Sequence, residues 1–150
     1  MVFSRECEYA LMGMAALAAD PGAQPVMLSE IAARGGLPLS FLSKIFQKLL
    51  KHGLVQSHRG ARRGYTLVRP ASAITLRQAL EAIEGPDLFD RCVFSHRHCS
   101  DDRPCQIHPV WRDVRPQVQA AFERAPLQDL VAAGAGVPFA TPSRRRAKRP

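Results

Sequence analysis

Residues 28–53 read LSEIAARGGLPLSFLSKIFQKLLKHG and contain two short helical patterns on either side of a Gly-Gly turn. The first pattern runs from Leu28 to Arg34 and the second from about Leu39 to His52. Apolar residues recur in the second pattern at three- and four-residue intervals, which predicts one buried helix face. Two short helices joined by a tight glycine-containing turn are typical of the helix-turn-helix motif.

The other face of the second helix carries hydrogen-bonding and cationic side chains. They are Ser40, Ser43, Lys44, Gln47, Lys48 and Lys51. A recognition helix places its N-terminal residues on base edges in the major groove of DNA. We therefore expect base contacts from Ser43, Lys44 and Gln47, a phosphate contact from Ser40, and a further DNA contact from Lys48. The alternative is the solvated face of an ordinary amphipathic helix.

A basic hairpin is predicted directly after this helix. Residues 54–58, LVQSH, alternate like a strand, and residues 65–68, YTLV, return as a second strand. The turn between them carries Arg59, Arg62 and Arg63. A hairpin in this position is the wing of a winged helix, and its arginines are candidates for binding phosphates or a minor groove. The alternative is an ordinary charged hairpin.

Charge is unevenly distributed along the chain. The formal net charge is +8, and residues 144–149 hold five of the 21 basic residues. Between Glu30 and Glu81 there is no acidic residue at all, although this interval contains nine lysines and arginines. A long stretch of one sign predicts a positive face whose partner is a polyanion, here double-stranded DNA. A solvated basic surface that aids solubility is the alternative.

The remaining patterns complete a mainly α-helical fold with a small β-hairpin. Further helices are predicted for residues 4–19, 74–84, 110–124 and 127–131. Pro116 falls inside the third of these and is expected to kink that helix or delay its start. The apolar residues of the same helix form a stripe that packs either against this chain or against a second copy.

We therefore divide the chain into four parts. They are a winged helix-turn-helix domain (1–84), a cysteine-rich loop (85–108), the long C-terminal helix with a short one after it (109–133), and a disordered basic tail (134–150).

Three of the four cysteines lie in residues 92–108, which read CVFSHRHCSDDRPCQIH. The stretch is polar and contains Ser, Asp and Pro, which is typical of a loop. A loop that carries Cys92, Cys99, Cys105 and His108 can wrap around a metal centre. Where thiols are kept reduced, clustered cysteines more often bind metal than form disulfides.

Six short motifs together resemble the Rrf-type winged-helix regulators, a family that includes IscR-like, NsrR-like and RirA-like proteins. The matching motifs are Tyr9-Ala10, Leu39-Ser40-Phe41-Leu42, Gly53-Leu54-Val55, Arg59-Gly60, Gly64-Tyr65 and His108-Pro109-Val110-Trp111-Arg112-Asp113. The resemblance covers roughly residues 2–131. It implies a transcription factor and not an enzyme: a homodimer, paired through the long C-terminal helix, that binds a palindromic operator.

The resemblance also implies an iron–sulfur cluster, of the two-iron (2Fe–2S) or four-iron (4Fe–4S) type, held by Cys92, Cys99 and Cys105. His108 stands where IscR-like members have a histidine ligand. Glu8 stands where NsrR-like members use an acidic residue of the partner chain. We prefer His108 as the fourth ligand because it lies in the same loop. One departure is the spacing, since six and five residues separate these cysteines, whereas the family often has five and five.

Two other kinds of chemistry compete with the cluster. A structural zinc ion takes the same Cys₃His ligand set, although no pair of cysteines shows the Cys-x₂₋₄-Cys spacing typical of zinc sites. The three thiols can also act without metal, as a switch that forms disulfides on oxidation. An enzyme with Cys105 as nucleophile and His108 as base is disfavoured, because no third group in the sequence orients the pair.

The sequence carries no membrane-spanning signal. No run of eighteen apolar residues occurs in it, and acidic residues stand near the N-terminus where a signal peptide has only basic ones. We therefore expect a cytoplasmic protein with no membrane partner.

Overall fold

The computed structural model describes residues 3–19, 24–95 and 97–134. Its elements are α1 (Arg5–Ala18), α2 (Leu28–Gly35), α3 (Leu39–Lys51), β1 (Val55–His58), β2 (Gly64–Leu67), η1 (Ala71–Ala73), α4 (Leu76–Glu84), η2 (Leu88–Asp90), α5 (His108–Arg124) and α6 (Leu127–Ala132). The described part is thus mainly helical with one antiparallel hairpin, as predicted. Residues 135–150 of the predicted basic tail lie outside it.

The helix-turn-helix is formed by α2 and α3. Gly36 ends α2 in the left-handed conformation (φ 61°), which lets the amide of Leu37 return to the carbonyl of Ala32 at 2.9 Å. The predicted apolar face of α3 is confirmed, because Leu42, Ile45, Phe46 and Leu49 are buried.

The wing is formed by β1 and β2, with Val55 opposite Leu67 and His58 opposite Gly64. Val26, just before α2, forms an isolated antiparallel bridge to Tyr65 of β2 through two main-chain hydrogen bonds (3.0 and 2.8 Å). A Cβ atom on Gly64 would lie 2.6 Å from the carbonyl oxygen of Val26, so this close approach requires glycine. The wing is therefore fastened to the start of the helix-turn-helix.

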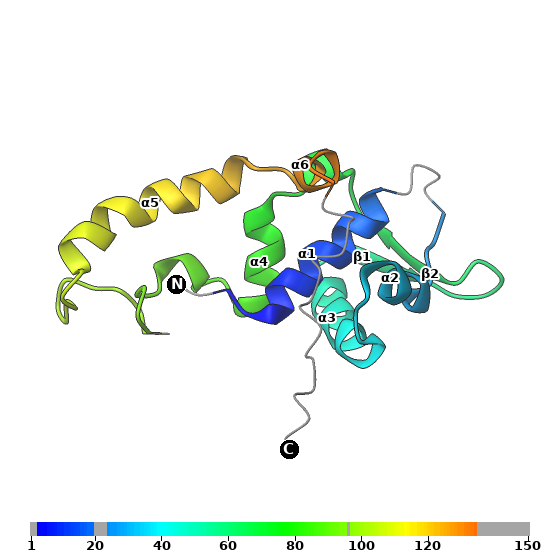
Figure 1. Cartoon of the computed structure of the whole chain (residues 1–150), viewed down its shortest axis with the longest axis horizontal. Helices are drawn as coiled ribbons and strands as arrows, with labels where there is room; N and C mark the ends of the chain where they lie inside the picture. Colours follow the sequence, from blue (N-terminus) through cyan, green and yellow to red (C-terminus); the bar gives the residue numbers. More distant parts are fainter. Residues whose placement is uncertain (1–2, 20–23, 96, 135–150) are drawn as a thin grey trace, which may run out of the picture.

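Helix α1 runs through the centre of the described core (Figure 1). Ser4 caps it by accepting a hydrogen bond from the amide of Cys7 at 3.4 Å. Gly13 lets α1 approach α3 closely, since a Cβ atom there would lie 2.7 Å from the ring of Phe46. Leu127 of α6 is fully buried in the same core. Helix α1, which precedes the wing in the chain, and helix α6, which follows it, thus pack into one hydrophobic core.

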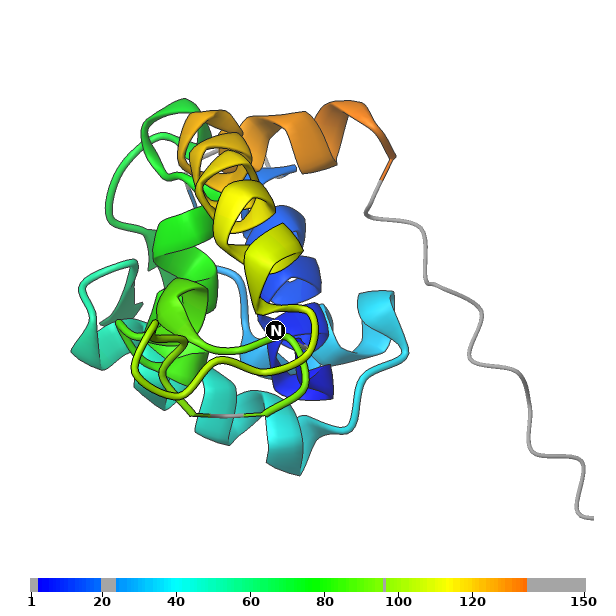
Figure 2. The ribbon, with the colours of Figure 1, turned by 90° about the vertical axis from the view of Figure 1, so that its left-hand side faces the viewer.

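Helix α5 lies along one side of the molecule, with the cysteine loop at its start (Figures 1 and 2). The helix is continuous from His108 to Arg124, so the expected late start at Pro116 is wrong. Pro109 lies in the first turn, where an amide hydrogen is not needed. Pro116 has no amide hydrogen to donate to the carbonyl one turn earlier in the helix. Because Pro116 is exposed, water can solvate that carbonyl instead.

None of the helices in the described segments combines the length and hydropathy needed to cross a membrane.

Candidate functional site

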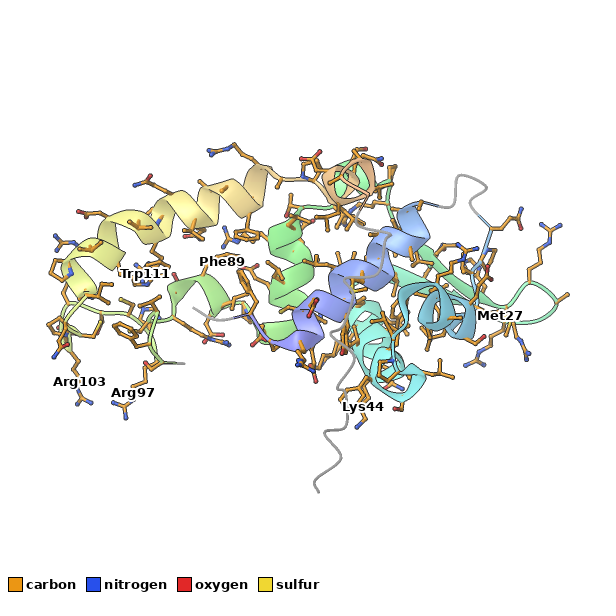
Figure 3. All side chains as sticks on the ribbon, in the orientation of Figure 1. Met27, Lys44, Phe89, Arg97, Arg103 and Trp111 are labelled. Atoms are coloured by element: carbon orange, nitrogen blue, oxygen red, sulfur yellow. The ribbon has the colours of Figure 1, made fainter. Side chains whose placement is uncertain are left out.

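The residues expected to contact DNA lie on α3 and on the wing. Ser40, Lys44, Gln47, Arg59, Arg62 and Arg63 are exposed, and Ser43 and Lys48 are half-buried. Lys44 points away from the body of the molecule (Figure 3). Arg62 donates a hydrogen bond to Gln24 at 3.3 Å, which supports one side of the wing tip. The polar face of α3 and the arginines of the wing are therefore available to a ligand.

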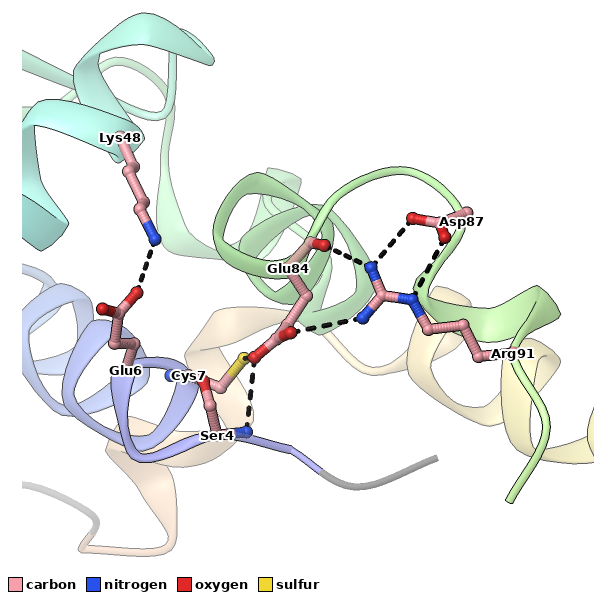
Figure 4. Close-up of polar contacts among 7 residues, drawn as sticks. All are labelled: Ser4, Glu6, Cys7, Lys48, Glu84, Asp87 and Arg91. Atoms are coloured by element: carbon pink, nitrogen blue, oxygen red, sulfur yellow. Dashed lines mark hydrogen bonds and ion pairs between the residues drawn. The ribbon is translucent and has the colours of Figure 1, made fainter. Parts of the chain in front are cut away.

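Lys48, on α3, makes an ion pair within the chain. Its ammonium group makes an ion pair with the carboxylate of Glu6 on α1 (Figure 4). The two residues are 42 positions apart in the sequence. The sequence did not predict this contact. The interval between Glu30 and Glu81 contains no acid, but folding places an acid from outside the interval, Glu6, beside α3.

The first half of the cysteine loop is organised by main-chain hydrogen bonds. The amide of Cys92 donates to Arg97 and the amide of Cys99 donates to Asp90, each at 2.8 Å. Two side chains of α5 also donate hydrogen bonds to main-chain carbonyls of these two paired segments. Trp111 donates its indole N–H to the carbonyl of Arg91 at 3.2 Å. Arg115 donates to the carbonyls of Asp90 and Cys99 at 3.3 and 3.4 Å. Cys92 and Cys99 are thus positioned by the backbone and by α5.

The four candidate ligands line one cavity of about 430 Å³. They form two pairs: the sulfurs of Cys92 and Cys105 are 3.7 Å apart, and the sulfur of Cys99 lies 3.2 Å from Nδ1 of His108. Cys92, Cys99 and His108 are buried, while Cys105 is half-buried. The arrangement brings together the loop residues that the sequence proposed as ligands.

The two buried thiols of the cavity have different acidities. A hydrogen bond from the backbone of Phe94 lowers the pKa of Cys92 below its ordinary value, which favours the thiolate. Burial raises the pKa of Cys99, so this thiol tends to keep its proton. The thiolate form is therefore favoured more at Cys92 than at Cys99, which lies beside His108.

Within residues 3–19, 24–95 and 97–134, no three His, Cys, Asp or Glu side chains converge on the position of a single metal ion. Four donors around one zinc ion must each lie about 2.0–2.3 Å from its centre. The four donors of the described chain do not have that arrangement.

His108 is held from its second nitrogen by Asp101. Nε2 of His108 lies 2.9 Å from Oδ1 of Asp101, and Arg112 approaches the same oxygen at 3.6 Å. The hydrogen bond with His108 lowers the pKa of Asp101, which keeps this carboxylate charged. The expectation that no third group orients this histidine is therefore wrong, because Asp101, which was not among the predicted site residues, holds its ring. A carboxylate a few residues from a candidate histidine ligand was the signal that could have found it.

A polar network connects the cysteine loop to α1 (Figure 4). Arg91, next to Cys92, donates to the carboxylate and the main-chain carbonyl of Glu84 at 3.3 and 2.6 Å, and to both oxygens of Asp87 at 2.9 and 3.1 Å. The other carboxylate oxygen of Glu84 accepts from the amide of Ser4 (3.4 Å) and the thiol of Cys7 (3.6 Å).

Burial acts to raise the pKa of Glu84, but hydrogen bonds from Ser4, Cys7 and Arg91 outweigh it and lower this pKa below its ordinary value. Burial and the negative charge of Glu84 raise the pKa of Cys7 to about 11. Cys7 is therefore a buried thiol that tends to keep its proton.

Glu8, the alternative fourth ligand, is exposed on α1 and is not among the residues that line the cysteine cavity. It lines a separate apolar cavity of about 380 Å³, formed by α1 with Leu80, Phe122 and Leu130. Within this chain His108, and not Glu8, lies beside one of the three loop cysteines, Cys99.

Residues 3–133 match the family model described as "Rrf2: Iron-dependent Transcriptional regulator". The transcriptional regulator IscR of Escherichia coli is 33% identical over 123 residues, which are 82% of this chain and 75% of IscR. Among solved structures, CymR, the global cysteine regulator of B. subtilis, aligns with a TM-score of 0.75 and 28% identity over 89% of this chain and 98% of CymR. IscR of T. potens aligns with a TM-score of 0.69 and 29% identity over 89% and 88% of the two chains.

Proposed function

The chain belongs to the Rrf2 family of DNA-binding transcriptional regulators, and from this premise we propose that it is a homodimer whose affinity for a palindromic operator is controlled by an iron–sulfur cluster in the cysteine loop. One observation carries the proposal. Three thiols and one imidazole line a single cavity in the segment that joins α4 to α5.

The donor set fits a cluster. Cys92, Cys99, Cys105 and His108 would hold it, and the alternative fourth ligand is Glu8 of a partner chain. A bound cluster supplies iron and sulfide that react with oxidants or nitric oxide, and one non-cysteine ligand makes it more easily perturbed. The same Cys₃His set also fits a structural zinc ion, because the 3.7 Å between the sulfurs of Cys92 and Cys105 is about the separation of two thiolates on one tetrahedral ion. Iron, sulfide and zinc assays therefore have to distinguish the two.

DNA reading is assigned to the surface formed by α3 and the wing. Ser43, Lys44 and Gln47 would contact base edges and Ser40 a phosphate, with Lys48 as a further contact from the same helix. Arg59, Arg62 and Arg63 would bind phosphates or a minor groove from the wing tip. The exposure of six of these eight side chains supports the assignment.

Dimerisation is assigned to α5. Its residues Val110 and Val114 are 61% and 39% exposed, and apolar side chains at this spacing face the same way on a helix. A second copy would bury them. Under this proposal the division into a winged domain (1–84), a cluster loop (85–108), dimer helices (109–133) and a basic tail (134–150) describes the working parts.

Communication between the parts follows from the contacts of the loop. Arg91 and Arg115 tie its first half to α4 and to α5, respectively. A change in the order of the loop therefore alters how α5, and with it the partner, is placed relative to the winged domain. Operator half-sites lie about 34 Å apart, so a small rotation at the dimer axis changes the fit of both recognition helices.

A visible absorption spectrum of protein purified without air, with iron, sulfide and zinc assays, tests the cofactor. Iron and sulfide in comparable amounts with a charge-transfer band are expected. Zinc without sulfide would reject the cluster in favour of a structural site. Replacing Cys99 with Ala should abolish the band and leave a folded dimer, whereas loss of folding would show that the site is structural.

A metal-free thiol switch is the second candidate, and one distance favours it. The sulfurs of Cys92 and Cys105 are 3.7 Å apart, and Cys92 has the lowered pKa that promotes attack on an oxidant. In this alternative, the signal that changes the conformation of the loop is oxidation of the two thiols to a disulfide, and not the loss of a cluster. Absence of iron, sulfide and zinc from anaerobic protein would support it.

A further inference from the structure

The side chains around His108 define which of its nitrogens can bind a ligand. Nδ1 faces the sulfur of Cys99 at 3.2 Å, on the cavity side, and Nε2 faces Oδ1 of Asp101 at 2.9 Å. We propose that Asp101 is a positioning residue that holds His108 in the tautomer with the proton on Nε2, so that Nδ1 presents its lone pair to the cluster. The inference rests on the proposed function and names a residue that the ligand set does not include.

The two nitrogens of an imidazole differ in what they can bind. A neutral imidazole has one N–H donor and one lone pair, and the hydrogen bond made by one nitrogen determines which nitrogen is free to bind a metal. A carboxylate only accepts, so Asp101 selects the N–H form at Nε2. A carboxylate behind a ligating histidine also fixes the ring orientation and raises its basicity.

Burial makes this selection effective. The side chain of His108 is 8% exposed, and the ring has a sulfur on one side and a carboxylate on the other. Asp101 is itself 78% exposed, but Arg112 approaches its Oδ1 at 3.6 Å, and Arg112 belongs to the same helix as His108. The carboxylate therefore has two partners on α5 that keep it behind the ring.

The neighbouring Asp102 provides a matched control. It carries the same group, is also exposed, and makes no hydrogen bond or ion pair with His108 in the described part of the chain. If only the loss of a negative charge in the loop mattered, Asp101→Ala and Asp102→Ala would have the same effect. A positioning role predicts an effect from Asp101 alone.

The first test uses the metal-free full-length chain, so it does not depend on the cluster. Long-range ¹H–¹⁵N correlation spectra of ¹⁵N-histidine-labelled protein report which nitrogen carries the proton. We expect His108 with the proton on Nε2 in the wild type and in Asp102→Ala, a mixture of tautomers in Asp101→Ala, and partial recovery in Asp101→Asn, which keeps an acceptor oxygen. A proton on Nδ1 in the wild type, or an unchanged spectrum in Asp101→Ala, would overturn the proposal.

The second test uses the cluster-loaded chain and measures the half-life of its visible band with an iron chelator present. Loss of a hydrogen-bond partner behind a metal ligand costs roughly 10–100-fold in affinity, and we expect Asp101→Ala to shorten the half-life by a factor in this range. In a His108→Cys background the same substitution should have no effect, because a thiolate has no ring N–H to hold. Equal shortening in both backgrounds would assign Asp101 a structural role and reject positioning.

The two tests separate this inference from the proposed function. Absence of iron and sulfide from the wild type would reject the cluster, whereas the tautomer of His108 is read without any metal. A wild-type ring protonated on Nδ1 would reject the role of Asp101 even in a chain that binds a cluster.

Discussion

Arg91 joins the last residue of α4 to the cysteine loop, because its guanidinium donates to both the carboxylate and the main-chain carbonyl of Glu84, at 3.3 and 2.6 Å. Both side chains are largely buried, with 13% and 15% exposed. The other oxygen of Glu84 accepts from Ser4 and Cys7 at the start of α1. One carboxylate is therefore shared by the loop and by the helix at the centre of the core.

Arg91→Ala should lower the free energy of unfolding by about 2 kcal/mol, since a partly buried charged hydrogen-bond network loses its donor. Urea denaturation of the metal-free chain measures this change. Arg124→Ala, at an exposed position of α5, is the matched control and should have little effect. An equal loss in both variants would mean that the network adds nothing specific.

The same link should transmit the state of the loop to the DNA-binding domain. Glu84→Gln removes the charge that Arg91 binds, and we expect the difference in operator affinity between cluster-loaded and cluster-free protein to shrink several-fold. Fluorescence anisotropy with labelled operator measures both affinities. An undiminished difference in Glu84→Gln would assign the communication to α5 alone.

Glu6→Gln should strengthen DNA binding, because it releases Lys48 from its ion pair and leaves its charge to a phosphate. We expect a few-fold rise in affinity and a salt dependence steeper by about one unit of slope. In a Lys48→Ala background the substitution should change neither quantity. A gain that persists without Lys48 would show that the acid acts through another residue.

Removal of one wing arginine should weaken DNA binding at all sequences alike. Arg59→Ala or Arg63→Ala is expected to lower the slope of log affinity against log salt by about one, because one phosphate contact is lost. Binding titrations at several salt concentrations give the slope. An unchanged slope in both variants would argue against the wing as a DNA contact.

Acidification should destabilise the chain through Glu84. The folded-state pKa of this carboxyl lies below its ordinary value of 4.5, so its contribution to stability is fully present above 4.5 and is lost as the pH falls through the lower, folded value. Denaturation midpoints measured across that window should fall with pH in the wild type. The fall should be smaller in Glu84→Gln. An equal pH dependence of the midpoint in both proteins would show that Glu84 does not contribute to acid destabilisation.

Oxidation of the metal-free chain should join Cys92 to Cys105. Their sulfurs must approach from 3.7 Å to about 2.05 Å, while Cys99 is held beside His108. One equivalent of hydrogen peroxide takes two electrons and two protons from the thiols, giving a disulfide and two waters. Peptide mapping by mass spectrometry identifies the pair. A disulfide that contains Cys99 would contradict the pairing seen around the cavity.

Local patterns in the sequence were sufficient for most of the fold. The apolar period of α3 and the glycine after α2 each depend on residues within one or two turns, and the structure confirms both predictions. The expected delay at Pro116 was wrong because the exposure of that residue, which decides whether its missing hydrogen bond matters, is a tertiary property.

The candidate ligands could also be predicted from the sequence, since three thiols and an imidazole within one short loop need no folding to be recognised. Only the tertiary structure decided how they pair, Cys92 with Cys105 and Cys99 with His108. It likewise brought Glu6 to Lys48 and Glu84 to Arg91. Periodicity and capping act between near neighbours in the chain, whereas these contacts depend on how α1, α4 and the loop pack together.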